Sequence, residues 1–153
     1  MTGVQTCALP ISCARELLTS YGLRSLNVAH PEFRPHYDGA VWDRDTSYHQ
    51  GTVWGYLLGH YAIAEYKVTG DAVAAQANLE PIRDHLMSGA LGTVSEIFDG
   101  VVPHTPRGAP AQAWSVACIL EAWVYLERKK NKNAYGVPIH KETNVVSMSK
   151  VEA

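Results

Sequence analysis

The sequence predicts an all-α fold in which helices buried around most of their circumference alternate with a helix that has one wet side. Residues 50–68 and 111–127 are apolar well beyond a single face, whereas residues 71–87 carry one apolar stripe and a polar side. This alternation is typical of a double ring of helices, in which inner helices contact both the hub and the outer ring. Polar loops precede both buried helices, so these loops open at one end of the ring.

The bulk composition indicates a single domain that lacks part of its surroundings. The chain has 153 residues and a net charge of -2, so nothing in it attracts nucleic acid or an acidic membrane. Charged residues make up 18%, below the roughly 25% of ordinary globular domains. Apolar residues also occupy the loops, and we therefore expect an excerpt of a larger domain. No run reaches the roughly 20 apolar residues of a membrane span.

The metal-binding and nucleophile motifs of common enzymes are missing from the sequence. Cys7, Cys13 and Cys118 form no C-x-x-C pair and no zinc spacing, which predicts no metal site and a reducing, cytoplasmic compartment. The seven histidines are scattered, without H-E-x-x-H. There is no G-x-S-x-G elbow and no phosphate-binding loop, so we expect no cofactor.

The two ends of the chain are set apart from the domain proper. Residues 1–11 resemble translated read-through of a sequencing adapter, and we expect residues 1–12 to be a non-native leader in front of a gene cut within the protein. Residues 13–128 would form the domain. Residues 129–153, which begin with a lysine- and asparagine-rich run, would be a polar tail that is solvated or disordered.

The first half of the domain predicts one long loop and one long helix. A helix ends over 15–20, and residues 23–46 show no sustained period and contain several prolines and glycines, which predicts a loop. From Gln50 to Lys67, apolar residues follow the spacing of three and four that indicates a helix.

The second half predicts a split helix, a loop and a buried helix. Gly70 and Asp71 read as a helix stop followed by an N-cap. The next helix runs to about residue 86, and Pro81 should kink or split it. Residues 88–109 are a loop rich in glycine and proline. Pro110 suits the first turn of the last helix, residues 111–128.

Two polar loops carry side chains that suit a sugar. Sugars offer hydroxyls to amide and carboxylate groups, and flat C–H faces to aromatic rings. One loop contains Glu96, His104 and Arg107 and leads into Gln112 and Trp114; the other is the run from Tyr48 to Trp54. Since both loops precede buried helices, we expect one pocket built from both.

Five motifs in order are similar to those of a known family. They are YGLRSL (21–26), YHQGTVW (48–54), EIFDG (96–100), PHTPRG (103–108) and AQAWSVA (111–117). Together they resemble the C-terminal amylo-α-1,6-glucosidase domain of glycogen debranching enzymes, over about residues 15–126. The family fold is an (α/α)6 toroid, so the resemblance implies that this chain is the C-terminal portion of that toroid.

The resemblance also implies a chemistry. It points to inverting hydrolysis of the α-1,6-linked glucose at branch points of glycogen or a related α-glucan, with no cofactor. Glu96 of EIFDG would be the general base, and the general acid would lie upstream of this chain. Departures at Gly55, Val101 and Ala109 leave that base in place. Two alternatives stay open: another toroid glycosidase, trehalase-like or glucoamylase-like, and an inactive glucan-binding helical module.

The remaining candidates have structural as well as functional interpretations. Asp43 and Asp45 flank Arg44 and would form a loop ion pair, or supply a local acid if the upstream part is absent. Asp99 would brace its loop. His49 and His104 would donate hydrogen bonds to sugar hydroxyls or to neighbouring loops. The candidate substrate-binding residues are Tyr48, His49, Gln50, Trp54, His104, Gln112 and Trp114, with Trp42 as a comparable aromatic.

Overall fold

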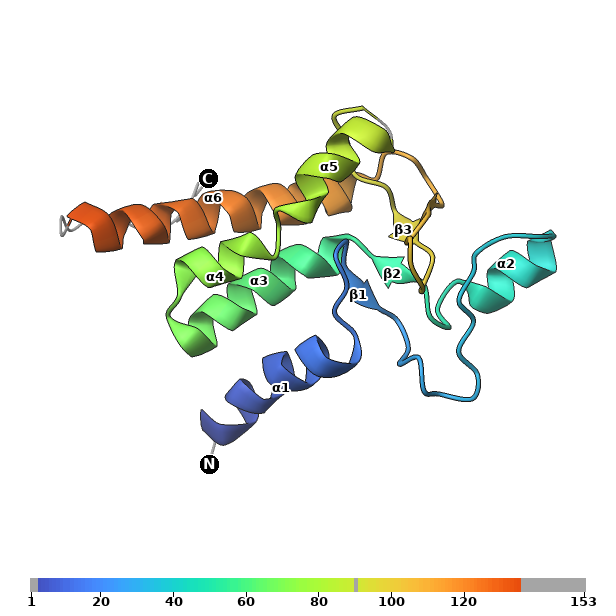
Figure 1. Cartoon of the computed structure of the whole chain (residues 1–153), viewed down its shortest axis with the longest axis horizontal. Helices are drawn as coiled ribbons and strands as arrows, with labels where there is room; N and C mark the ends of the chain where they lie inside the picture. Colours follow the sequence, from blue (N-terminus) through green and yellow to red (C-terminus); the bar gives the residue numbers. More distant parts are fainter. Residues whose placement is uncertain (1–2, 90, 136–153) are drawn as a thin grey trace, which may run out of the picture.

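Helices dominate the fold, which confirms the expected class. The computed structural model describes residues 3–89 and 91–135. In Figure 1, α3, α4 and α6 run along one another, α1 lies on the far side of α3, and α2 stands apart from this bundle. The elements are α1 (Gly3–Glu16), β1 (Leu23–Arg24), α2 (Val41–Ser47), β2 (Val53–Trp54), α3 (Tyr56–Thr69), α4 (Ala72–Ala77), α5 (Pro81–Ser88), β3 (Ile97–Phe98), β4 (Pro106–Arg107) and α6 (Ala113–Tyr135).

The core lies where α3, α4 and α5 pack against α6. One apolar cluster of buried residues contains Leu58 of α3, Ala75 of α4, Ile82 of α5 and Leu126 of α6, all at most 3% exposed. The closest approach is at Gly59, where an added Cβ atom would lie 2.2 Å from the carbonyl oxygen of Cys118. The absence of a side chain at Gly59 therefore lets α3 and α6 touch through their backbones.

The helix boundaries between α3 and α5 lie where the sequence predicts them. Gly70 has a left-handed φ of 74° and closes α3. The Oδ1 atom of Asp71 accepts hydrogen bonds from the amides of Val73 and Ala74, which makes Asp71 the N-cap of α4. Pro81 begins α5 after a turn, because proline fits a first helical position but not a helix interior. The predicted split is confirmed.

A small antiparallel sheet, absent from the sequence-based expectations, lies at one end of the helices. Its four strands have the order β1-β2-β3-β4. Val53 of β2 pairs with Arg24 of β1 and with Phe98 of β3, so the sheet joins segments that are distant in the chain. The expected helix start at Gln50 is wrong: a turn and β2 come first, and α3 begins only at Tyr56.

Three other boundaries differ from expectation. α2 interrupts the predicted loop of 23–46, and α1 ends at Glu16 rather than near residue 20. α6 starts at Ala113 and continues to Tyr135, into the segment expected to be a tail. Residues 136–153 lie outside the described part of the chain, and the division into leader, domain and tail stays a prediction.

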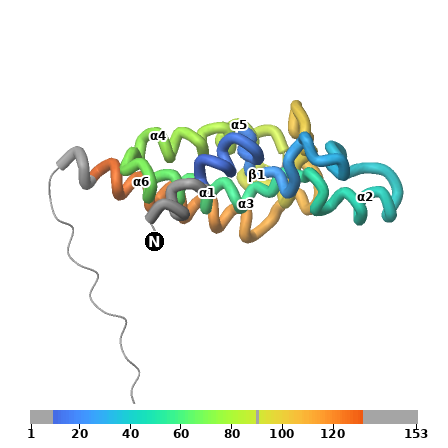
Figure 2. The backbone as a smooth tube through the Cα atoms, turned by 90° about the horizontal axis from the view of Figure 1, so that it is seen from below, coloured from blue at the N-terminus to red at the C-terminus, as the bar shows by residue number. Residues whose placement is uncertain are grey.

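The helices form an elongated arrangement with the sheet and loops toward one end. Figure 2 shows α2 at the opposite end of the molecule from the C-terminal part of α6. In the described ranges, no helix has the length and apolar character needed to cross a membrane.

Candidate active site

The Glu96 carboxylate is held by hydrogen bonds to both of its oxygens. The Tyr48 hydroxyl donates to Oε1, and the Ala109 amide donates to Oε2 at 2.9 Å. The amide of Glu96 in turn donates to the carbonyl of Ala109 at 2.9 Å. The loop thus fixes both the backbone and the side chain of Glu96, and the side chain is half-buried rather than turned outward.

Gly108 makes this clamp sterically feasible. It has a φ of +66°, and an added Cβ atom would lie 2.5 Å from Oε2 of Glu96. Only glycine combines that left-handed conformation with the close approach. The turn after β4 can therefore bring the Ala109 amide to the carboxylate.

Tyr48 connects Glu96 to an aromatic cluster. Its ring packs edge-on against Trp54 with centroids 5.0 Å apart, and against His49 at 4.7 Å. Burial, the hydrogen bond to Glu96 and the charge of Glu96 all raise the pKa of Tyr48 above its ordinary value. The phenol consequently stays protonated and acts as a donor to the carboxylate.

An open cavity with aromatic walls lies beside this cluster, with a volume of about 580 Å³. His49 stacks on Trp54 with centroids 5.3 Å apart and an interplanar angle of 5°. Tyr56 lies between Trp54 and Trp114, at centroid distances of 6.0 and 5.9 Å. Trp114 is 51% exposed, so its ring face is available to a ligand. Such walls suit the C–H faces of a sugar ring.

Asp99 braces the loop that follows Glu96, as its position in the motif indicated. Its carboxylate is 3% exposed and receives Nε and Nη2 of Arg107 at 3.1 and 3.0 Å. The amide of Tyr37 donates to it at 2.9 Å. Burial alone would raise the pKa of Asp99, but hydrogen bonds from Arg107, Tyr37 and His36 outweigh burial and lower it. Asp99 is therefore an ionised brace and a poor proton donor.

His104 supports the same loop from inside. The residue is 6% exposed, and its Nδ1 atom donates to the carbonyl of Asp99 at 2.8 Å. Of its two expected roles, the contact with a loop is present. The expected contact with substrate is not supported, because the ring has almost no exposed surface.

Comparison with known proteins shows the family of the chain. A family model described as amylo-alpha-1,6-glucosidase matches residues 5–121. The chain belongs to the amylo-alpha-1,6-glucosidase family. Its helix-dominated fold is consistent with the helical toroid-type glycosidase domain of that family, and all five motifs named above fall within the match. No curated protein matches the chain.

Asp43 and Asp45 are exposed on α2. Oδ2 of Asp43 accepts the amide of Ala40 at 3.0 Å, while Nη1 of Arg44 donates to the carbonyl of Gly39 at 2.7 Å. The predicted ion pair of Arg44 with the two aspartates is wrong in the described part of the chain. Asp43 instead serves the first turn of α2, where a carboxylate is favourable.

Gln50 and Gln112 of the motifs form hydrogen bonds through their backbones, and neither is among the residues that line the cavity. The carbonyl of Gln50 accepts the amide of Arg34 at 2.6 Å, and the amide of Gln112 donates to Val94 at 3.0 Å. Both side chains are half-buried. Their contact with substrate stays a prediction.

Tyr56 and Arg24 were not named among the candidate site residues from the sequence. Tyr56 forms a wall of the cavity, and Nε of Arg24 donates to the carbonyl of Gly100 at 2.7 Å. Tyr56 follows the YHQGTVW motif closely, which was a usable signal, whereas nothing near Arg24 indicates its distant partner. Among residues 3–89 and 91–135, no three His, Cys, Asp or Glu side chains are grouped as metal ligands would be.

Proposed function

We propose that this chain supplies the general base and part of the pocket of a glycosidase that hydrolyses α-1,6-linked glucose with inversion. The observation that supports the proposal best is the two-sided clamp on Glu96 by Tyr48 and Ala109, beside an aromatic cavity. Membership of the amylo-alpha-1,6-glucosidase family supports this proposal, and we take the substrate to be the branch points of glycogen or a related α-glucan.

Glu96 would remove a proton from the attacking water. Each carboxylate oxygen has two lone pairs, so Oε1 and Oε2 can each keep one hydrogen bond and still accept from water. The clamp leaves the carboxylate in one orientation, which lowers the entropy to be lost in reaching the transition state. In that state, the proton moves to Glu96 as the water oxygen attacks the anomeric carbon on the face opposite the leaving group.

The general acid would come from a segment N-terminal to this chain. Inverting enzymes separate their two carboxyl groups by about 6.5–9.5 Å, which leaves room for the water. Asp99 is ionised and fully engaged with Arg107. Asp43 and Asp45 are exposed on α2, so neither has the burial that would hold an acid protonated.

The decisive experiment measures glucose released from a phosphorylase limit dextrin by the protein encoded by the complete gene. Glu96→Gln keeps the shape of the side chain but removes the base, and we expect a loss of about 10³-fold or more in kcat, with the dextrin still bound. Glu32→Gln, at an exposed loop carboxylate, is the matched control and should leave the rate unchanged. Proton NMR should show β-glucose as the first product. A Glu96→Gln variant that keeps its rate would refute the assignment.

A second candidate function is glucan binding without turnover. The open aromatic cavity favours it, since such a cavity can bind a sugar. The pairing of Asp99 with Arg107 also favours it, since Asp99 is then a poor proton donor. The 153-residue chain alone should bind malto-oligosaccharides and release no glucose. If the complete protein also binds limit dextrin but releases none, the binding function replaces hydrolysis.

A further inference from the structure

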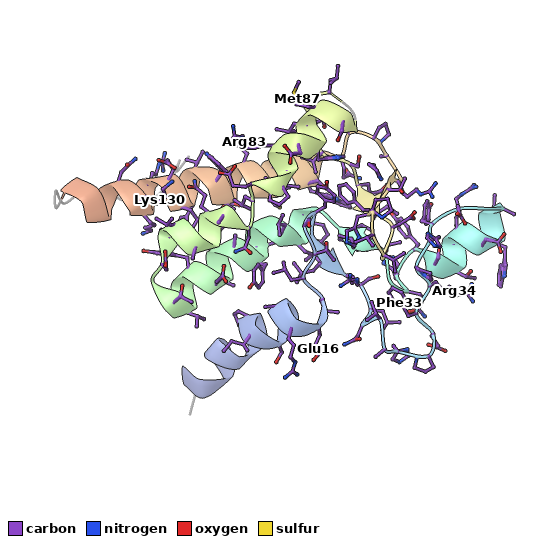
Figure 3. All side chains as sticks on the ribbon, in the orientation of Figure 1. Glu16, Phe33, Arg34, Arg83, Met87 and Lys130 are labelled. Carbon is purple, nitrogen blue, oxygen red and sulfur yellow. The ribbon has the colours of Figure 1, made fainter. Side chains whose placement is uncertain are left out.

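His85 of α5 is buried on the side of that helix that faces the sheet. His85 is 1% exposed. Its ring packs edge-on against Phe98 with centroids 4.8 Å apart, and it is tilted against the ring of Tyr21 at 5.8 Å. Figure 3 shows Arg83 and Met87, two residues to either side, pointing outward from the same helix. A histidine at this position is therefore the polar exception on an otherwise apolar inner face.

The His85 ring accepts a hydrogen bond from the backbone of the next segment. The amide of Ser95 donates to Nε2 of His85 at 3.1 Å, and Ser95 is 2% exposed. An accepting Nε2 carries no proton, so the ring is the neutral tautomer with its hydrogen on Nδ1. Burial lowers the pKa of His85, in agreement with a neutral ring.

This bond lies one residue before the proposed base. Glu96 is then tied to Ala109 through its own amide, so the backbone on both sides of the Ser95–Glu96 peptide is fixed. The last turn of α5 also closes on the ring: a Cβ atom at Gly89 would lie 2.3 Å from Cε1 of His85. The ring has little freedom to leave Ser95.

We propose that His85 is a positioning residue: through the Ser95 amide, it fixes the peptide that carries Glu96 and so sets the direction of the carboxylate. This inference rests on the proposed function for its catalytic meaning. The hydrogen bond itself can be tested without any turnover.

The substitutions His85→Gln and His85→Asn form a matched pair. The side-chain amide of Gln reaches the place of Nε2, whereas that of Asn reaches only the place of Nδ1. Both bury an amide, so their general effects on folding should be similar. In the 153-residue chain, we expect hydrogen exchange of the Ser95 amide to accelerate at least tenfold in His85→Asn and to stay close to wild type in His85→Gln. Equal exchange rates in the two variants would overturn the proposal.

A measurement on the unmutated chain tests the proposal even if both variants fail to fold. Long-range ¹⁵N–¹H spectra should show His85 with hydrogen on Nδ1 and a bare Nε2. The opposite tautomer would overturn the proposal even if neither variant folds.

Activity of the complete protein separates this inference from the proposed function. We expect His85→Asn to lower kcat for glucose release at least fivefold with little change in KM, and His85→Gln to restore most of it. If the wild-type protein releases no glucose but the two exchange rates differ as expected, the hydrolytic function fails and the positioning bond stands. If glucose is released and both variants match wild type in kcat, the positioning role fails and the function stands.

Discussion

Tyr48 donates its phenolic hydrogen to Oε1 of Glu96, a residue 48 positions further along the chain. The contact links the loop after α2 to the loop before β3, so the two motifs that suit a sugar meet at one carboxylate. Tyr48 also packs on Trp54, which lines the cavity. The side chain of Tyr48 thereby contacts both the proposed base and the aromatic wall.

Replacing Tyr48 by Phe should separate these two roles. The ring and its packing on Trp54 remain, but Oε1 of Glu96 loses a donor. A hydrogen bond to a charged group contributes about 1.5–3 kcal/mol, so kcat for glucose release should fall about 10- to 100-fold. KM for limit dextrin should change little, because the aromatic walls are intact. Steady-state kinetics check this, and a loss confined to KM would contradict it.

Replacing Gly108 by Ala should displace the carboxylate. The new methyl would lie 2.5 Å from Oε2 of Glu96, in addition to the strain of a φ of +66°. Gly92→Ala is the matched control, since Gly92 has a φ of +74° and an added Cβ atom meets nothing within 4 Å. The strain of the left-handed backbone should cost each variant about 1 kcal/mol of stability, and the clash with Glu96 should add to the loss in Gly108→Ala. Glucose release should fall at least tenfold more in Gly108→Ala than in Gly92→Ala, and equal rates would contradict the clamp.

Asp99→Asn should weaken the loop brace in a pH-dependent way. The folded protein lowers the pKa of Asp99, so the unfolded chain binds more protons in acid and stability is lost as pH falls below the ordinary value of 3.8. The variant should lose about 1–3 kcal/mol at neutral pH, because Arg107 loses its nearer and buried carboxylate partner. Below pH 4, its deficit against wild type should narrow.

Chemical denaturation across pH measures this, with Asp38→Asn as the control. Asp38 is 61% exposed and 3.8 Å from Arg107, so its loss should change stability by less than about 1 kcal/mol. A deficit for Asp99→Asn that stays constant down to pH 3 would contradict an ionised brace.

Trp114→Ala should weaken glucan binding without unfolding the chain. Its ring is 51% exposed on the cavity wall. Loss of one aromatic contact corresponds to about 0.5–1.5 kcal/mol, or roughly a 2- to 12-fold weaker affinity for malto-oligosaccharides. Trp42→Ala, which removes a 75% exposed ring of α2, is the control and should bind as wild type. Isothermal calorimetry measures the affinity of the two variants. An equal loss of affinity in both would contradict a binding site at Trp114 and would indicate one that includes α2.

The long helices and the boundaries between them were predictable from the sequence. Apolar periodicity located α3 and α6, and Gly70, Asp71 and Pro81 marked the boundaries between α3 and α5 through local backbone chemistry. Strands of two residues are too short to show alternation, so the sheet could not be found. α2, with seven residues, is similarly too short for a helical period.

The candidate site was predictable in its residues but not in their pairing. The motifs named Glu96, Tyr48 and Trp54, yet the bond between Tyr48 and Glu96 depends on tertiary folding. His104 shows the opposite case: a polar residue in a loop suggests exposure, but a left-handed φ of 59° turns it inward onto its own loop. His85 carried no signal at all, because its partner is a backbone amide.

The backbone contact of Gly59 with Cys118 has a consequence for the shape of the opening. Tyr56 stands three residues before Gly59, and Trp114 four before Cys118, so both rings lie about one helical turn beyond the contact. The gap between the two rings is thus set by how near the helix axes come at that crossing. A methyl group there would force the two helices apart, and the mouth of the cavity would widen without any change to the rings that line it.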